Sequence, residues 1–157
     1  MKLNMIVCVA KDNLIGDANP TGNGLLWHSK EELAYFKKIT TGHVVAFGEN
    51  TAKHVPIELM KKDRYVEVLT IGDNTVFNLM NKYANSGKDL FVCGGHSVYR
   101  STLDFYDFDT IYISKLKDHV EVKHADNPLY FPDVEELGYV KVSEEEHEDF
   151  IACVYKK

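Results

Sequence analysis

The sequence predicts an α/β fold in which helices flank a mostly parallel central sheet and an antiparallel hairpin closes the chain. Short apolar runs rich in Val and Ile alternate with helical segments, an order typical of strand-helix-strand units. The last two strand-like runs, 139–143 and 150–155, break this rhythm and indicate a hairpin. A chain of 157 residues with no linker or internal repeat is expected to form a single domain over 1–157.

Five apolar runs, each bounded by turn-forming residues, are the expected strands of the parallel part. The first is apolar at nearly every position, which is typical of a central strand buried on both faces. The five ranges are 3–10, 43–47, 65–71, 90–93 and 110–114.

The first long helix is expected to begin after Ser29 and to end at about 40–42. Ser29 is a good N-cap, and Ser29 through Glu32 fits a capping box. Asn50 or Thr51 is expected to cap a short helix before Pro56. Further helices are expected at 75–85 and 97–103.

Two polar segments are expected to lack regular structure. Residues 17–24 are dense in Gly, Asn and Pro, which predicts a long mobile loop of the kind that often serves as a lid. The acidic run 144–149 is expected to be the solvated turn of the hairpin, because its carboxylates show no ligand spacing for a metal.

Charge and cysteine content exclude several classes of function. The 24 acidic residues against 18 Lys plus Arg give a net charge of -6 with no basic stripe, so no nucleic-acid partner is expected. Cys8, Cys93 and Cys153 lie in apolar runs at unrelated spacing, which favours reduced core thiols and predicts no metal site. The N-terminal apolar run is too short for a signal peptide, and no run approaches a membrane span. We therefore expect a cytoplasmic protein with no membrane partner.

Glu32 is an unusual residue for its place in the first long helix. Glu32, Phe36 and Ile39 stand at i, i+4 and i+7 with Tyr35 beside them, so Glu32 is directed toward the buried face. Such a carboxylate has a raised pKa unless it is paired, and it is a candidate for binding a cationic heterocycle or moving a proton. Alternatively, a Glu at the third helical position reaches back to the N-cap N–H and has only a structural role. Both interpretations are open from the helix alone.

Two glycine-containing turns have the parts that an anionic diphosphate requires. Ligands of an open parallel sheet bind at the carboxyl ends of the strands. Gly94-Gly95 follows a strand and precedes a helix, so a ligand can approach the backbone and the N–H groups of the helix start. Residues 48–51 offer the same arrangement with hydroxyl and amide donors. Each turn taken alone is also consistent with an ordinary tight turn.

Together with Glu32, these turns form a pattern that resembles dihydrofolate reductase along nearly the whole chain. The order and approximate spacing of the matching segments follow the family. They are Leu14-Ile15-Gly16, Trp27 five residues before Glu32, 33–37, 48–51, Arg64, 92–95 with Val98-Tyr99, 111–114 and 131–133. The resemblance implies a three-layer dihydrofolate-reductase-like fold. It also implies hydride transfer from a reduced nicotinamide cofactor to C6 of dihydrofolate, giving tetrahydrofolate, by an enzyme that is expected to be a monomer.

The resemblance assigns catalytic roles to three residues. Glu32 matches the acid that grips the ring nitrogen and 2-amino group of the pterin and assists protonation of N5 through water. An acid held away from bulk water suits this role, because its proton affinity moves toward the working pH. Ser114 matches a hydroxyl that hydrogen-bonds the acid and the pterin. Trp27 matches the tryptophan that organises water beside the acid.

The same resemblance implies two groups of binding residues. Arg64 matches the arginine that takes the glutamyl α-carboxylate of the substrate. The other substrate-binding positions are Ile6, Val7, Cys8, Leu33, Phe36, Val55, Cys93 and Tyr99, whose types core packing would explain equally well. The cofactor-binding positions are Ile15, Gly16, Gly48, Glu49, Asn50, Thr51, Thr70, Gly94, Gly95, His96, Ser97, Val98 and Tyr99.

Several positions depart from the family pattern. The implied cofactor is NADPH, yet Glu49 and Ser97 stand where relatives usually carry the cations that hold its 2′-phosphate, so NADH is a possible cofactor. Lys53, His54 or His96 would have to compensate. The lid has Leu26-Trp27 in place of Pro-Trp and is longer than in short relatives, and the hairpin turn is shorter. We therefore expect lid closure to be stabilised differently.

Two other functions fit the same features. A non-catalytic dihydrofolate-reductase-like module, with a binding or structural role, would suit the missing basic cofactor positions. A related reductase for another pterin, or for a pyrimidine intermediate of flavin synthesis, would share the fold. The Trp27 to Glu32 spacing and Arg64 favour folate.

Overall fold

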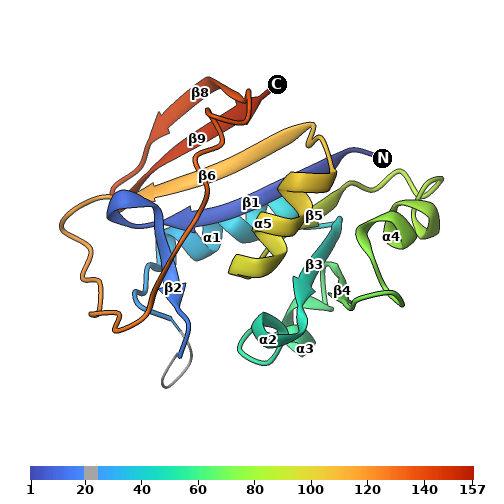
Figure 1. Ribbon diagram of the computed structural model, residues 1–157, viewed down its shortest axis with the longest axis horizontal. Coiled ribbons are helices and arrows are strands. Elements are labelled where there is room, and N and C mark those ends of the chain that lie inside the picture. Colours follow the sequence, from blue (N-terminus) through green and yellow to red (C-terminus); the bar gives the residue numbers. More distant parts are fainter. Residues whose placement is uncertain (20–24) are drawn as a thin grey trace.

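A seven-stranded sheet forms the middle layer of the computed structural model, which describes residues 1–19 and 25–157 (Figure 1). The strand order is β4-β3-β5-β1-β6-β9-β8. The first five strands in this order are parallel, whereas β9 pairs antiparallel with both β6 and β8. This confirms the predicted parallel sheet with a C-terminal hairpin. The strands are β1 Leu3–Val9, β3 Val44–Gly48, β4 Tyr65–Leu69, β5 Leu90–Val92, β6 Thr110–Leu116, β8 Val140–Glu146 and β9 Phe150–Lys156.

Helices cover both faces of the sheet. One face packs against α4 (Val76–Lys82) and α5 (His96–Phe105), and the other packs against α1 (Lys30–Thr40), α2 (Glu49–Ala52) and α3 (Ile57–Met60). In Figure 1, α5 lies in front of β1 and α1 lies behind it.

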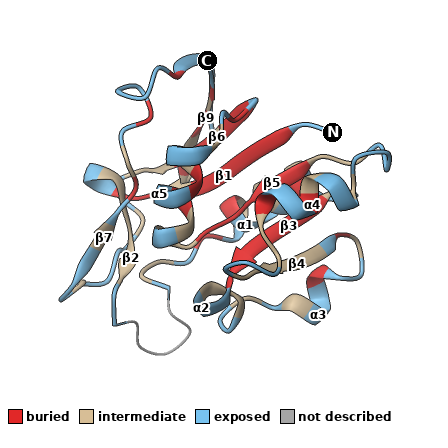
Figure 2. Ribbon diagram, turned by 45° about the vertical axis from the view of Figure 1, so that its right-hand side comes forward, coloured by how far each residue is buried: buried red, intermediate tan, exposed pale blue. Residues whose placement is uncertain are grey.

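Side chains alternate between two apolar clusters along the central strand β1. Leu3, Met5 and Val7 belong to the cluster under α4 and α5, whereas Ile6 belongs to the cluster under α1. Because both faces of β1 are covered, the strand is apolar at every position except Asn4, as the nearly continuous apolar run in the sequence predicts. Figure 2 shows the buried residues concentrated in β1 and its neighbours, with exposed residues on the outer sides of the helices.

The acidic run at the end of the chain is partly a strand, so its assignment as a turn over 144–149 is wrong. Glu144, Glu145 and Glu146 belong to β8 and pair with β9, and only 147–149 turn the chain. All seven residues of β8 are exposed. An edge strand with neither face covered holds carboxylates without desolvating them, and charged edges also discourage pairing with other chains.

The short helix after β3 begins earlier than predicted. Gly48 is the N-cap of α2, and the helix starts at Glu49 rather than after Asn50 or Thr51. The reason is tertiary: a Cβ on residue 48 would lie 2.7 Å from Cγ2 of Val98, so only glycine lets the chain turn there against α5. A further short helix, α3, follows Pro56 and was not predicted.

A second, two-stranded sheet was also missed. β2 (Leu14–Asp17) pairs antiparallel with β7 (Pro128–Tyr130), after a short 3₁₀ turn, η1, over Lys11–Asn13. Asp17 extends the pairing, since its Oδ2 accepts the N–H of Asp126 at 3.0 Å. The start of the expected lid is therefore a paired strand. The rest of the predicted mobile loop, 20–24, lies outside the described residues.

The longest helix of the described ranges is α1, with 11 residues. No helix in this part of the chain combines the length and the hydropathy that crossing a membrane requires.

Candidate active site

The residues assigned to catalysis gather where β1 and β6 end and α1 begins. β1 lies between β5 and β6, so the chain leaves the middle of the sheet in both directions, and such switch points open a crevice at the carboxyl ends of the strands. Cys8 of β1 is paired in register with Ser114 of β6. The first turn of α1, which carries Glu32, covers this end of the sheet.

Glu32 is a buried carboxyl group without a counter-ion. Its exposure is only 8%, and burial raises its pKa from 4.5 to about 7, with the Ser114 hydroxyl opposing part of the shift. No ion pair to Glu32 occurs among the described residues, and its carboxylate makes no hydrogen bond back to the Ser29 N–H there. Only half of the predicted capping box is present: Ser29 Oγ accepts the Glu32 N–H at 3.2 Å. The purely structural interpretation of Glu32 therefore lacks the contact on which it depends.

Ser114 presents a buried hydroxyl toward Glu32. The residue is 1% exposed, and within the described ranges its Oγ has no hydrogen-bond partner of full geometry. It still lies close enough to Glu32 to lower the pKa of that carboxyl. An unsatisfied hydroxyl beside a buried acid has donor and acceptor capacity left for a ligand or water.

Trp27 and Cys8 complete the surroundings of the acid. Burial raises the pKa of the Cys8 thiol, the charge of Glu32 raises it further, and a hydrogen bond with the Trp27 side chain lowers it in part. Cys8 therefore neighbours both Glu32 and Trp27, although they come from different segments. The predicted grouping of these residues is present.

Four of the nine predicted substrate-binding residues lie in the apolar cluster under α1. Ile6, Phe36, Val55 and Cys93 pack together there. Val7 does not join them, because alternation along β1 sends its side chain into the cluster under α5.

Leu33 and Tyr99, two further residues of the predicted substrate pocket, lie at the margins of the apolar cluster under α1. The Leu33 side chain is 48% exposed on α1. Tyr99 is buried, and its hydroxyl donates to the Ile6 carbonyl at 2.8 Å, which fixes α5 to β1 beside the pocket.

Arg64 lies beside the far end of α1, held by partners that the sequence did not reveal. Its Nε donates to Asp63 Oδ1 at 2.7 Å, and its Nη1 donates to Thr40 Oγ1 at 3.4 Å. The guanidinium carbon lies 5.8 Å from the centre of the Phe36 ring. Asp63 also pairs with Lys37 at 3.5 Å. Hydrogen bonding to Arg64 lowers the pKa of Asp63, so this cluster carries two cations and one anion.

The two glycine turns lie against each other. The Gly48 N–H donates to the Gly94 carbonyl at 2.8 Å, and a Cβ on residue 95 would lie 2.6 Å from Thr51 Oγ1. The Gly94-Gly95 peptide is cis. Among the described residues, no side-chain hydrogen bond caps the start of α5 at Gly95, so the first N–H groups of the helix remain available to a ligand. Bare backbone and a free helix start fit the diphosphate of a dinucleotide.

Comparison with known proteins identifies this arrangement. The sequence profile of the family described as dihydrofolate reductase matches residues 2–154. The chain belongs to the dihydrofolate reductase family. The dihydrofolate reductase of Mycoplasma genitalium is 34% identical over 125 residues, covering 71% of this chain and 74% of that protein. The dihydrofolate reductase of Bacillus subtilis is 28% identical over 152 residues, covering 92% and 83%. The resemblance inferred from the sequence is thereby confirmed.

Within this dihydrofolate reductase fold, both acidic and basic side chains lie around the cradle. Glu49 is the exposed first residue of α2, and Ser97 is exposed in the first turn of α5. Burial and then the neighbouring Arg100 lower the pKa of His96, which disfavours its cationic form. Lys53 and His54 are exposed beyond the end of α2. Arg100 is a cation near the cradle that sequence reasoning missed; its spacing of four from His96 on a helix was the available signal.

The remaining predicted cofactor positions lie on turns and on the lid strand. The Thr70 hydroxyl accepts the Asn74 N–H at 3.0 Å and so holds the turn after β4. Ile15 packs against the cluster under α5, and a Cβ on Gly16 would meet no atom within 4 Å. Asn50 is exposed, whereas Val98 packs against Gly48.

Proposed function

We propose that this chain is a dihydrofolate reductase in which Glu32 is the acid that binds and helps to protonate the pterin. The observation that carries the proposal is a buried carboxyl with a pKa raised to about 7, next to Ser114, in a chain that matches the family over residues 2–154. When bound, a reduced nicotinamide supplies the hydride that goes to C6 of 7,8-dihydrofolate, and the product is 5,6,7,8-tetrahydrofolate.

Glu32 has the properties that pterin binding and proton delivery require. Its two carboxyl oxygens suit a ring nitrogen and an adjacent amino group, which together form a planar pair of hydrogen bonds. With a pKa of about 7, the group is partly protonated at neutral pH and exchanges a proton readily. Ser114 is positioned to hydrogen-bond the same ligand edge, and Trp27 to order the water through which a proton reaches N5.

The rest of the substrate is expected to lie along α1 toward Arg64. Phe36 and Val55 supply apolar walls for an aromatic ring. Arg64 uses Nε and Nη1 for Asp63 and Thr40, and its Nη2 makes no hydrogen bond within the described ranges. That free edge of the guanidinium suits the α-carboxylate of a glutamyl tail.

The cofactor would be held by the cradle of 48–51 and 94–98. We propose that the enzyme has a weak preference, or none, for NADPH over NADH. Glu49 would repel a 2′-phosphate and instead accept a hydrogen bond from a ribose 2′-hydroxyl. We further expect the chain to work as one domain over 1–157, as a monomer in the cytoplasm.

The test is a paired assay of dihydrofolate reduction with NADPH and with NADH. We expect turnover with both cofactors and a loss of roughly a hundredfold or more in kcat for Glu32→Gln, which cannot ionise. Glu148→Gln is the matched control, because the Glu148 side chain is exposed and makes no hydrogen bond or ion pair with the described residues.

Two results would count against the proposal. A folded protein that turns over dihydrofolate with neither cofactor would leave only a binding module with the family's architecture. A kcat/KM ratio of more than about a hundredfold in favour of NADPH, worth nearly 3 kcal/mol, would contradict the role given to Glu49.

A further inference from the structure

The turn between β8 and β9 is joined to the helix turn that carries the catalytic acid. Asp149 accepts a hydrogen bond from Ser29 Oγ at 2.6 Å, although the two residues are 120 positions apart. The same Ser29 oxygen accepts the N–H of Glu32 at 3.2 Å. A hydroxyl has one hydrogen, so its donation to Asp149 orients the lone pairs of Ser29 toward Glu32. Asp149 therefore acts on the backbone of the acid through a single intervening atom.

The helix returns a matching set of contacts to the turn. Glu31 Oε1 accepts the Asp149 N–H at 2.8 Å, and Glu31 Oε2 accepts the Glu148 N–H at 3.3 Å. The Asp149 carboxylate of the turn thus accepts a hydrogen bond from Ser29 at the start of the helix, and the Glu31 carboxylate of the helix accepts hydrogen bonds from the turn. Such charge-assisted hydrogen bonds are shorter and stronger than neutral ones. We call this set of contacts, made by Ser29, Glu31 and Asp149, the hairpin clamp.

Asp149 is itself fixed by the segment that follows β6. His119 Nε2 lies 3.1 Å from Asp149 Oδ1, and the Lys117 N–H donates to the Asp149 carbonyl at 2.8 Å. Hydrogen bonds from Ser29 and then from His119 lower the pKa of Asp149, which keeps it ionised. Each side-chain oxygen of Asp149 has one partner, so its orientation is determined.

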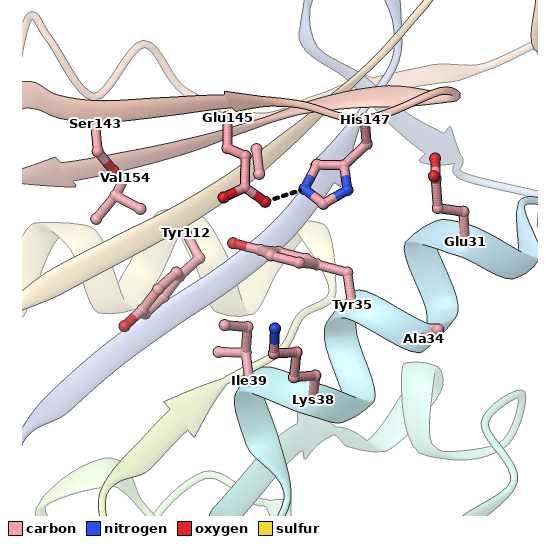
Figure 3. A pocket seen from close by; sticks show the side chains of 11 residues that line it. Glu31, Ala34, Tyr35, Lys38, Ile39, Tyr112, Ser143, Glu145, His147 and Val154 are labelled. Carbon is pink, nitrogen blue, oxygen red and sulfur yellow. Dashed lines mark ion pairs between the residues drawn. The ribbon is translucent and has the colours of Figure 1, made fainter.

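Aromatic packing extends the attachment by one helical turn. Tyr35 contacts Phe150 with ring centres 5.3 Å apart, and His147 stacks on Phe150 at 4.4 Å. In Figure 3, Tyr35 points from α1 toward His147 and Glu145 of the hairpin, and Glu31 lies one turn nearer the start of the helix. Alongside these contacts, α1 and strands β6, β8 and β9 line an open cavity of about 450 Å³. The hairpin clamp and the aromatic contacts of Tyr35 with the hairpin therefore join the hairpin to α1 at the edge of this cavity.

We propose that Asp149 is a positioning residue for dihydrofolate reduction: through Ser29 it sets the place of the Glu32 backbone, and hence of the acid, at the end of the sheet. The proposal rests on the proposed function of Glu32. Catalytic groups lose roughly a hundredfold in rate when displaced by about 1 Å, so the first turn of α1 must be held closely. The closing hairpin thereby contributes to catalysis without touching the substrate.

The test compares Asp149→Ala, Asp149→Asn and Ser29→Ala with the control Glu148→Ala. The control removes a neighbouring carboxylate that makes no hydrogen bond or ion pair with the described residues. We expect Asp149→Ala to lower kcat by roughly tenfold and to leave the KM for the cofactor within about twofold. Asp149→Asn keeps an oxygen that accepts from Ser29 and should recover most of the rate. The double variant Asp149→Ala/Ser29→Ala should be no slower than either single variant, because the two residues act as one unit.

A second measurement needs no turnover. Hydrogen exchange of the Glu32 amide should be at least about tenfold faster in Asp149→Ala and Ser29→Ala, and unchanged in Glu148→Ala. If Asp149→Ala fails to fold, Ser29→Ala should still show the lower kcat and the faster exchange, and Asp149→Asn should retain most of the wild-type rate and exchange. A folded Asp149→Ala with wild-type kcat and wild-type exchange at Glu32, or additive losses in the double variant, would overturn the proposal. Failure of the wild-type protein to reduce dihydrofolate would instead refute the proposed function, and the exchange result would still report on the clamp.

Discussion

Replacing the buried acid Glu32 should make the protein more stable, by an amount that depends on pH. Glu32 has a pKa of about 7 in the folded protein against 4.5 for a free side chain. The folded state therefore binds this proton more tightly than the unfolded state does, and the free energy of unfolding falls as pH rises from about 4.5 to about 7. Glu32→Gln stays neutral and does not suffer this loss.

The size of the effect follows from the pKa shift. At about 1.4 kcal/mol per pKa unit, the shift corresponds to roughly 3 kcal/mol once the pH is above both values. Glu32 is 8% exposed, so little solvent screening reduces this value. At about pH 5 the carboxyl is still protonated in the folded protein. By the same relation, Glu32 then lowers the free energy of unfolding by less than about 1 kcal/mol. Glu32→Gln should therefore gain roughly 2 to 3 kcal/mol more stability at about pH 8 than at about pH 5.

Urea unfolding of both proteins at the two pH values measures this difference. Effects of the substitution that do not depend on pH cancel between the two conditions, and Glu148→Gln controls for loss of one surface carboxylate. If Glu32→Gln changes the free energy of unfolding equally at both pH values, Glu32 titrates normally in the folded protein. The reason for assigning it proton chemistry would then be gone.

Three other substitutions test the cofactor cradle and the substrate end of the site. Glu49→Arg should raise kcat/KM with NADPH relative to NADH by roughly tenfold in steady-state kinetics, and an unchanged ratio would exclude Glu49 from cofactor selection. Gly95→Ala places a Cβ 2.6 Å from Thr51 Oγ1. It should weaken cofactor binding by at least about tenfold in a fluorescence titration, and unaltered binding would show that the cradle is elsewhere. Asp63→Ala should raise KM by roughly tenfold for dihydrofolate but not for dihydropteroate, which has no glutamate, because Arg64 loses its orientation; equal effects on both substrates would contradict this role.

Local sequence signals determined the elements that build the site. Ser29 as N-cap and the helical spacing of Glu32, Phe36 and Ile39 placed a carboxylate toward the buried face of α1. Gly48 and the pair Gly94-Gly95, each directly after an apolar run, placed the cradle, and the apolar run of β1 identified the centre of the sheet. These signals operate within about ten residues, where propensity and periodicity decide the conformation. The alternation of side chains along β1 was also available as a signal, and it would have placed Val7 and Ile6 on opposite faces of the sheet.

Tertiary structure alone decided what those elements do together. The raised pKa of Glu32 depends on burial by segments remote in sequence, and its partner Ser114 is opposite Cys8 only because β6 pairs with β1. The pairing of β2 with β7, the edge position of β8 and the attachment of Asp149 to Ser29 are likewise contacts across more than 100 residues or at a sheet edge. No local pattern encodes such contacts, because they arise when the whole chain packs its apolar faces and the remaining polar groups take the partners within reach.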